Sequence, residues 1–269
     1  MNKKQRKLLS ILLAVICLVS GGLYASTLLD YGTGSSAYSE AEALALQAEP
    51  DATAESTEAP AEGPRQWVPA AVTGDPNVTE LAKKSLTALR QENEDVVGWI
   101  WIPDTNINYP LMQGEDNDFY LEHTWQKKKN AVGSIFLEWQ NSRDLSEFNT
   151  IVYGHNMLDD SMFSQLHDYR EEGFPESHPY VYLLSDAGVW RYRVFATYKA
   201  DTDSKTYQIG MQQEKTKQEY IDHALENSVI DTGCTPAVTD RILTLSTCSG
   251  MGYETRWVVH AYLPMELAA

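Results

Sequence analysis

A cysteine and an arginine stand at the facing ends of two apolar runs near the carboxyl end of the sequence. Cys248 ends the run 242–248, and Arg256 begins the run 256–263. If both runs are strands that pair antiparallel across the loop 249–255, the Cα atoms of the two residues lie about 5 Å apart. A guanidinium in this place stabilises a thiolate, and it can hold a carbonyl oxygen on which negative charge develops. The pair therefore indicates acyl transfer by a thiol nucleophile.

Such a nucleophile needs a proton shuttle, and the sequence offers six histidines. His155 follows an apolar run and a glycine, where a side chain is exposed at a strand end; a loop histidine with no chemical role is the alternative. His260 shares a strand face with Arg256, yet four residues of strand separate them by about 13 Å, so we expect it in the core or on the surface. The remaining histidines stand in polar or helical contexts and are expected to be solvated: His123, His167, His178 and His223.

The chain has three cysteines, too few for a disulfide scaffold, and the odd number leaves at least one thiol unpaired in a monomer. Cys17 lies in an apolar stretch and Cys234 in an expected loop, so neither is assigned a chemical role. A disulfide between Cys234 and Cys248 is the alternative, and it would consume the nucleophile. The spacing of Cys and His is not typical of a metal site, so we predict neither a metal nor a cofactor.

The amino end has the composition of a membrane anchor. Four basic residues within positions 1–7 precede residues 8–29, which contain no Asp, Glu, Lys or Arg. As a helix, this stretch is about 33 Å long, enough to cross a hydrocarbon core of about 30 Å. A cleaved signal peptide is the competing interpretation. Because basic residues stay in the cytoplasm, we expect residues 1–7 inside the cell, a single span in the membrane and the remainder outside.

Residues 30–74 are interpreted as an acidic, disordered linker. The segment 34–64 has seven acidic residues and no Lys or Arg, and its apolar residues are mostly Ala. It therefore buries too little surface to offset the entropy of ordering, and its like charges favour an extended chain. The whole chain of 269 residues has a net charge of −17, which argues against a nucleic-acid partner.

The remaining residues, 75–269, are predicted to form one mainly β domain. An amphipathic helix is expected over 77–91, after which short apolar runs dominate. A helical stripe at 212–227 lies within a long connection between late strands. Besides the two runs described first, strands are expected at 96–102, 107–112, 134–137, 150–153, 180–184 and 190–198. This pattern is typical of a β-barrel or sandwich with a few peripheral helices.

In these residues the chain resembles the sortase family. The segment TLSTC at 244–248, with Arg256 after it and His155 before it, is similar to the Cys, His and Arg set of that family. Four further segments stand in the order seen in class B sortases: VGWIWIP at 97–103, NYP at 108–110, GSIF at 133–136 and YGHNM at 153–157. The resemblance spans 77–263 and implies an eight-stranded β-barrel with an N-terminal helix and a helical insertion between late strands. One departure is Ser249, where several class B relatives have an acidic residue, so no carboxylate partner is predicted for His155.

The resemblance also implies a reaction, transpeptidation on a C-terminal sorting signal of secreted proteins. Cys248 would attack a backbone carbonyl and form a thioester, which an amine of peptidoglycan or of its lipid-linked precursor would resolve. His155 would be the general acid and then the general base. Arg256 would bind the substrate carbonyl and stabilise its oxyanion, while Ser246 and Thr247 would help to bind the peptide.

Two other functions are compatible with the same residues. In a surface-displayed binding or adhesion domain, Cys248 would be a buried apolar residue without chemistry. In a hydrolytic cysteine peptidase, the same three side chains would act, and water rather than an amine would take the acyl group. Reactivity of the thiol separates the first alternative from an enzyme, and product analysis with an added amine separates the second from a transpeptidase.

Overall fold

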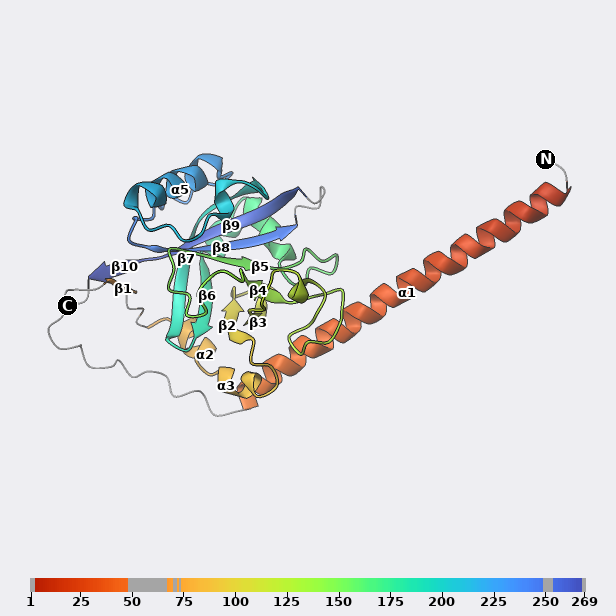
Figure 1. Cartoon of the computed structure of the whole chain (residues 1–269), viewed down its shortest axis with the longest axis horizontal. Helices are drawn as coiled ribbons and strands as arrows, with labels where there is room; N and C mark the ends of the chain where they lie inside the picture. Colours follow the sequence, from red (N-terminus) through yellow and green to blue (C-terminus); the bar gives the residue numbers. More distant parts are fainter. Residues whose placement is uncertain (1–2, 48–66, 70–71, 73, 249–253, 268–269) are drawn as a thin grey trace.

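Eight strands close into a barrel in the order β2-β3-β4-β5-β8-β9-β7-β6 (Figure 1). The computed structural model describes residues 3–47, 67–69, 72, 74–248 and 254–267. The barrel strands are β2 (Val96–Trp101), β3 (Asn108–Met112), β4 (Ile135–Leu137), β5 (Asn149–Tyr153), β6 (Tyr180–Ser185), β7 (Gly188–Asp201), β8 (Arg241–Cys248) and β9 (Thr255–Leu263). The eight-stranded barrel implied by the resemblance is confirmed, and every expected strand is present with ends shifted by at most three residues.

Strand pairing brings three segments of the chain to one end of the barrel. β5 and β8 run parallel, with Tyr153 opposite Ser246, so both strands end at the same edge. The backbone N–H of Gly154 donates to the Ser246 carbonyl at 3.1 Å and continues this pairing. β8 and β9 are antiparallel, and Cys248 is the register partner of Arg256, as the pattern of the two runs predicts. The ends of β5 and β8 and the start of β9 therefore meet.

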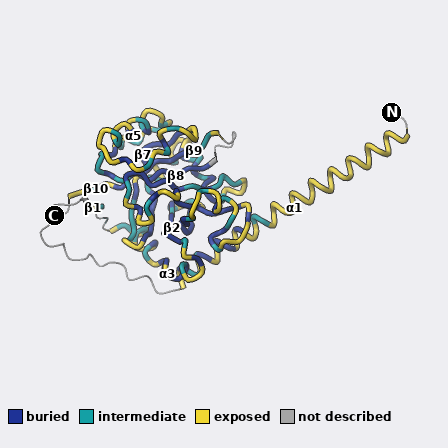
Figure 2. The backbone as a smooth tube through the Cα atoms, viewed as in Figure 1, coloured by how far each residue is buried: buried dark blue, intermediate teal, exposed yellow. Residues whose placement is uncertain are grey.

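Side chains of β8 are buried on both faces of the strand. Leu243 and Leu245 belong to the larger hydrophobic core, which most of the barrel strands share. Ile242 packs in a second core beneath α5 (Glu214–Asn227), the helical insertion predicted at 212–227. Figure 2 shows β8 and the neighbouring barrel strands as mostly buried tube, whereas the connections between strands are more exposed. Because both faces are covered, the position of β8 in the barrel is closely fixed.

Two short helices, α2 (Pro76–Leu81) and α3 (Leu86–Arg90), replace the single helix expected over 77–91. Each has its own N-cap, because Asp75 accepts from the Asn77 N–H at 2.9 Å and Ser85 accepts from the Ala88 N–H at 3.2 Å. A capping serine favours a new helix start over continuation of the preceding helix. Apolar spacing alone therefore gave a wrong prediction of one continuous helix.

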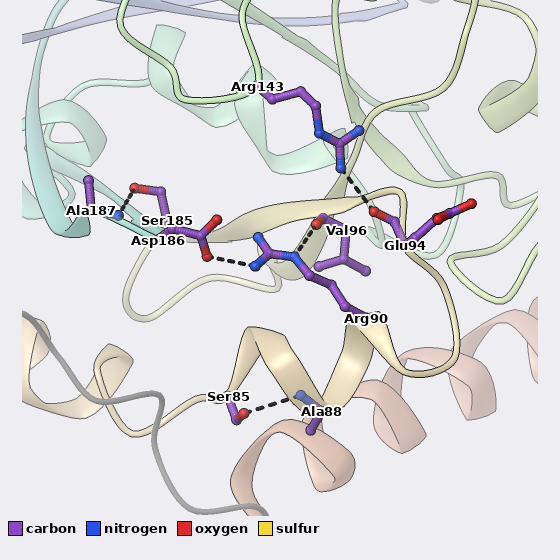
Figure 3. A network of polar contacts seen from close by, with 9 residues as sticks. All are labelled: Ser85, Ala88, Arg90, Glu94, Val96, Arg143, Ser185, Asp186 and Ala187. Atoms are coloured by element: carbon purple, nitrogen blue, oxygen red, sulfur yellow. Dashed lines mark hydrogen bonds and ion pairs between the residues drawn. The ribbon is translucent and has the colours of Figure 1, made fainter.

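Polar contacts tie α3 to the start of β2 (Figure 3). Arg90 donates Nε–H to the Val96 carbonyl at 2.8 Å and Nη1–H to Asp186 at 2.6 Å. The guanidinium of Arg143 donates to the Glu94 carbonyl at 2.9 Å. The remaining elements are β1 (Trp67–Pro69) paired with β10 (Met265–Leu267), α4 (Phe174–Ser177) and three 3-10 helices, η1 (Phe119–Leu121), η2 (Ser164–Arg170) and η3 (Lys205–Tyr207).

α1 (Lys3–Gln47) is one continuous helix, so the expectation of an extended linker is wrong for its residues 30–47. Residues 3–29 are exposed and project away from the barrel, and the helix is long and apolar enough to cross a membrane (Figure 1). Beyond them the helix lies against the domain and buries Gly34, Ala37, Tyr38, Ala41 and Ala45. Alanines at this spacing favour a helix and form a face that can pack closely. The linker residues 48–66 lie outside the described part of the chain.

A buried lysine fixes the docked part of α1. The Lys84 ammonium lies 2.8 Å from the Glu42 carboxylate and 4.3 Å from the ring centroid of Trp99. Asn108 also donates to Glu42, at 2.8 Å. Burial by itself raises the pKa of Glu42, but the hydrogen bonds and the charge of Lys84 hold it below its usual value. These contacts show that the last third of α1 belongs to the folded domain.

Candidate functional site

A groove of about 310 Å³ opens at the end of the barrel where β5, β8 and β9 meet. Four of the five side chains predicted from the sequence line it, namely His155, Ser246, Thr247 and Arg256. The fifth, Cys248, is placed by its backbone at the end of β8, and its side chain lies outside the described part of the structure. The other lining residues are Asn117, Asp118, Leu121, Phe136, Tyr153, Gly154, Thr202 and Tyr207.

His155 is held by a backbone carbonyl of a neighbouring loop. Its Nε2 lies 2.7 Å from the carbonyl oxygen of Leu121, at the end of η1. Because a carbonyl oxygen only accepts, Nε2 carries the proton in this bond, and Nδ1 is the basic nitrogen of the neutral ring. This bond fixes both the tautomer and the plane of the imidazole.

The loop that carries His155 is closed on itself. The N–H of Phe163 donates to the His155 carbonyl at 2.9 Å, and Asn156 forms an isolated bridge with Met162. Gly154 lies where no side chain fits, since a Cβ there would stand 2.4 Å from Ile135 Cδ1 and 2.8 Å from the Phe163 ring. The close approach of the backbone to these two residues sets the direction in which the next residue leaves β5.

A buried carboxylate supports two residues that line the groove, Tyr153 and Asn117. Glu138, which directly follows β4, is 7% exposed and accepts from the Tyr153 hydroxyl at 3.0 Å and from Asn117 Nδ2 at 2.6 Å. Burial raises the pKa of Tyr153, the charge of Glu138 raises it further, and the charge of Arg256 lowers it. The sequence analysis missed this carboxylate because its partners come from segments 15 and 21 residues away.

Aromatic side chains form one side of the groove. Tyr153 and Tyr207 stack with ring centroids 6.4 Å apart, and Phe136 lies against Tyr153 at 5.4 Å. Tyr207 comes from η3, in the long connection between β7 and β8 that also contains α5, and its hydroxyl lies 3.0 Å from Ser246 Oγ. The buried hydroxyl of Thr247 has no hydrogen-bond partner among the described residues. An extended ligand can therefore pack against an apolar wall here.

His260 lies in the core, which is one of the two locations expected for it. It is fully buried between Thr244 Oγ1 and the Tyr198 hydroxyl, each 3.1 Å from a ring nitrogen, and burial lowers its pKa to about 3. The remaining histidines do not line the groove and are half-buried rather than fully solvated: His123, His167, His178 and His223. Cys234 carries a free thiol, so the alternative disulfide with Cys248 is not formed.

Comparisons with known proteins agree with this geometry. A family profile described as the sortase domain matches residues 100–264. The sortase B of Listeria monocytogenes is 36% identical over 172 residues, covering 64% of this chain and 70% of that protein. The sortase B of Staphylococcus aureus is 34% identical over 176 residues, covering 65% and 72%. Among solved structures, a Bacillus anthracis (B. anthracis) sortase B complex with AAEK1 matches with a TM-score of 0.71 at 29% identity, over 89% of this chain and 100% of that one. A Staphylococcus aureus sortase B-substrate complex matches with a TM-score of 0.62 at 33% identity, over 68% and 84%.

Proposed function

Since this chain belongs to the sortase family, as a cysteine transpeptidase of the sortase B type, we propose that Cys248, His155 and Arg256 carry out its reaction. The observation that carries this assignment is the strand register. The parallel pair β5–β8 and the antiparallel pair β8–β9 bring all three residues to one end of the barrel. His155 and Arg256 line the same groove there.

In the first half of the reaction, the Cys248 thiol loses its proton to His155 and its sulfur attacks the scissile carbonyl of a sorting signal. Arg256 holds the oxygen of that carbonyl as it becomes negatively charged. With Nε2 bonded to the Leu121 carbonyl, Nδ1 of His155 is the nitrogen that takes the proton and returns it to the leaving amine. The peptide bond breaks and a thioester remains on the enzyme.

In the second half, an amine attacks the thioester carbonyl. His155 accepts a proton from that amine, and the thiolate of Cys248 leaves as the new amide bond forms. We propose that a peptidoglycan cross-bridge or its lipid-linked precursor supplies the amine. Ser246 and Thr247 are proposed peptide-binding residues, and their place in the lining of the groove supports this role.

We further propose that the apolar part of α1 anchors the enzyme in the cell membrane. The exposed apolar face at residues 8–29 and the basic residues before it support a single span with residues 1–7 in the cytoplasm. The catalytic domain then lies outside the cell, where secreted proteins emerge. We propose that this domain begins before residue 75, because five residues of α1 are buried against it, namely Gly34, Ala37, Tyr38, Ala41 and Ala45.

A peptide library tests the proposed chemistry. The full chain in detergent micelles is incubated with pentapeptides that carry different sorting motifs, and intact-mass spectrometry looks for an acyl adduct on residue 248. Addition of an amine should remove the adduct and yield a new amide, whereas a hydrolytic peptidase would yield only the free acid. Turnover by the Cys248→Ala variant would rule out the assignment of the nucleophile.

A further inference from the structure

We infer that Tyr38, on the docked part of α1, is a positioning residue for His155. The inference rests on the proposed role of His155 as the acid and base of the reaction. It follows from a hydrogen bond of the Tyr38 hydroxyl to Gly133 and from the close packing of Gly133 against the imidazole. None of the residues between them is close to Tyr38 in the sequence.

The first contact joins α1 to the segment before β4. The Tyr38 hydroxyl donates to the Gly133 carbonyl and lies 3.1 Å from Ser134 Oγ. The ring is 8% exposed and meets Tyr109 edge to face, with centroids 5.1 Å apart. Burial raises the pKa of Tyr38, so the hydroxyl keeps its proton and remains a donor throughout the neutral range. The carbonyl of Ala37, the residue before Tyr38, accepts from Trp125 Nε1 at 2.8 Å.

The second contact joins Gly133 to the imidazole. Gly133 has φ +63°, and a Cβ there would stand 3.0 Å from His155 Cδ2. The same Cβ would stand 2.6 Å from the Leu121 carbonyl oxygen, which is the oxygen that accepts from His155 Nε2. The backbone of Gly133 is therefore packed against both the ring and the ring's hydrogen-bond partner.

Hydrogen bonds of Ser134 hold these two segments together. Its N–H donates to the Tyr120 carbonyl at 2.8 Å, and its hydroxyl donates to the His123 carbonyl at 2.7 Å. The loop that presents the Leu121 carbonyl is thus bonded to the segment that Tyr38 holds. Each bond alone is modest, but a small shift of this backbone changes the geometry of the Nε2 bond directly.

Removal of the Tyr38 hydroxyl leaves the buried Gly133 carbonyl without this donor, so the segment is free to move relative to the ring. Proton transfer depends on the angle and distance of the imidazole, whereas peptide binding depends mainly on the groove walls. We therefore expect the variant to lose turnover rather than affinity. The helix that carries Tyr38 also carries the apolar stretch, so the anchor and the support of His155 are one element.

The test compares two tyrosine variants of the full chain in detergent micelles. Tyr38→Phe removes the hydroxyl and keeps the ring. Tyr169→Phe is the matched control, because Tyr169 is also buried, donates to the His178 carbonyl at 2.9 Å and does not line the groove. For peptide cleavage, kcat of Tyr38→Phe should fall about tenfold with KM within about twofold, and the limb of the pH profile that reports His155 should shift. The control should keep the wild-type kcat and pH profile.

Nitrogen NMR of the His155 imidazole provides a second readout that needs no turnover. The wild-type protein and Tyr169→Phe should show the Nε2–H tautomer, and Tyr38→Phe should show an altered shift or a mixture of tautomers. Unchanged His155 signals together with an unchanged kcat in Tyr38→Phe would overturn the inference. If His155→Gln retains wild-type turnover, the proposed function of His155 fails, and the inference about Tyr38 fails with it. The NMR comparison of Tyr38→Phe with the wild-type protein reports the position of the imidazole independently, so the two failures can be distinguished.

Discussion

The hydroxyl of Tyr153, which lines the groove together with Arg256, donates to the carboxylate of Glu138, 3.0 Å away. The same carboxylate accepts from Asn117, another lining residue. One buried acidic group therefore connects two walls that come from separate segments. The charge of Arg256, which is proposed to bind the substrate carbonyl, acts on the same tyrosine and lowers its pKa.

This connection predicts a graded loss of stability. Tyr153→Phe should lower the free energy of unfolding by about 1.5 kcal/mol, because one hydrogen bond to a charged group is lost. Glu138→Ala should cost about 3 kcal/mol, since it leaves the donors of Tyr153 and Asn117 unpaired and opens a cavity. Urea denaturation followed by tryptophan fluorescence measures both values. Equal losses in the two variants would show that Glu138 has no role beyond its bond to Tyr153.

Arg256 is predicted to act on the rate and not on the fold. Arg256→Gln should lower kcat/KM for peptide cleavage by about 10²- to 10³-fold, as expected for loss of an oxyanion donor. Arg256→Lys should recover only part of this loss, because an ammonium cannot reproduce the planar guanidinium. Steady-state kinetics provides the rates, and circular dichroism should show an unchanged β content in both variants.

His260 predicts a specific acid sensitivity of the fold. Burial lowers its pKa to about 3, whereas the unfolded chain titrates near 6.5. The unfolded state therefore binds a proton that the folded state excludes, and stability is lost as the pH falls from about 6.5 towards about 3. Within that pH window, the titration of His260 lowers the free energy of unfolding by about 1.4 kcal/mol for each pH unit.

The variant His260→Gln isolates this contribution, because Gln can still bond to Thr244 and Tyr198 but does not titrate. Between pH 7 and pH 5, the wild-type protein should lose about 2 kcal/mol more of unfolding free energy than the variant. Denaturant titrations at the two pH values measure the difference. Parallel losses in both proteins would show that His260 is protonated in the folded state.

Gly154→Ala is predicted to disturb the site from within the core. The added Cβ would meet Ile135 and the Phe163 ring at 2.4 and 2.8 Å, so the backbone of the loop has to shift. We expect a stability loss of about 1–3 kcal/mol together with a fall in kcat, because His155 is the next residue. Gly173→Ala is a control for the change of residue type, since an added Cβ there meets nothing within 4 Å, although its φ of +84° carries a local cost. Thermal unfolding and peptide cleavage are measured side by side.

The docked part of α1 predicts where a soluble fragment can begin. A fragment that starts at Tyr31 keeps the buried face of the helix, whereas one that starts at Gly74 removes the partners of Lys84 and Trp125. The shorter fragment should be less stable by at least about 3 kcal/mol and should bind a hydrophobic dye at the uncovered surface. Similar melting temperatures for the two fragments would contradict the docking of α1.

Local patterns in the sequence were sufficient for the strands and for part of the site. Alternation of side chains in 242–248 and 256–263 predicted the pairing of Cys248 with Arg256, and strand spacing excluded His260 from the site. The parallel pairing of β5 with β8, which brings His155 to the same place, has no local signal, because its two strands are almost ninety residues apart. Only the resemblance to the sortase family predicted that His155 lies near Cys248 and Arg256.

The docked helix and the groove walls depend on contacts that a local reading does not contain. An Ala-rich, acidic segment was interpreted as a linker because charge and low apolar content favour disorder. Its order depends on Trp125 and Lys84, which lie 88 and 42 residues away from their partners on the helix. Tyr207 and Glu138 were missed for the same reason, because their partners are distant in the sequence. The Tyr207 hydroxyl contacts Ser246 on β8, and Glu138 accepts from Tyr153 on β5.

The unbroken backbone of α1 also determines how the enzyme meets its substrates. From Asp30 to Gln47 the helix rises about 27 Å, and all of that length is rigid or attached to the barrel. Under the proposed membrane anchor, the catalytic domain cannot swing on a flexible tether above the bilayer. The secreted protein must instead carry a flexible segment that is long enough to bring its own sorting signal to the groove. The length of that segment then decides which secreted proteins can be substrates.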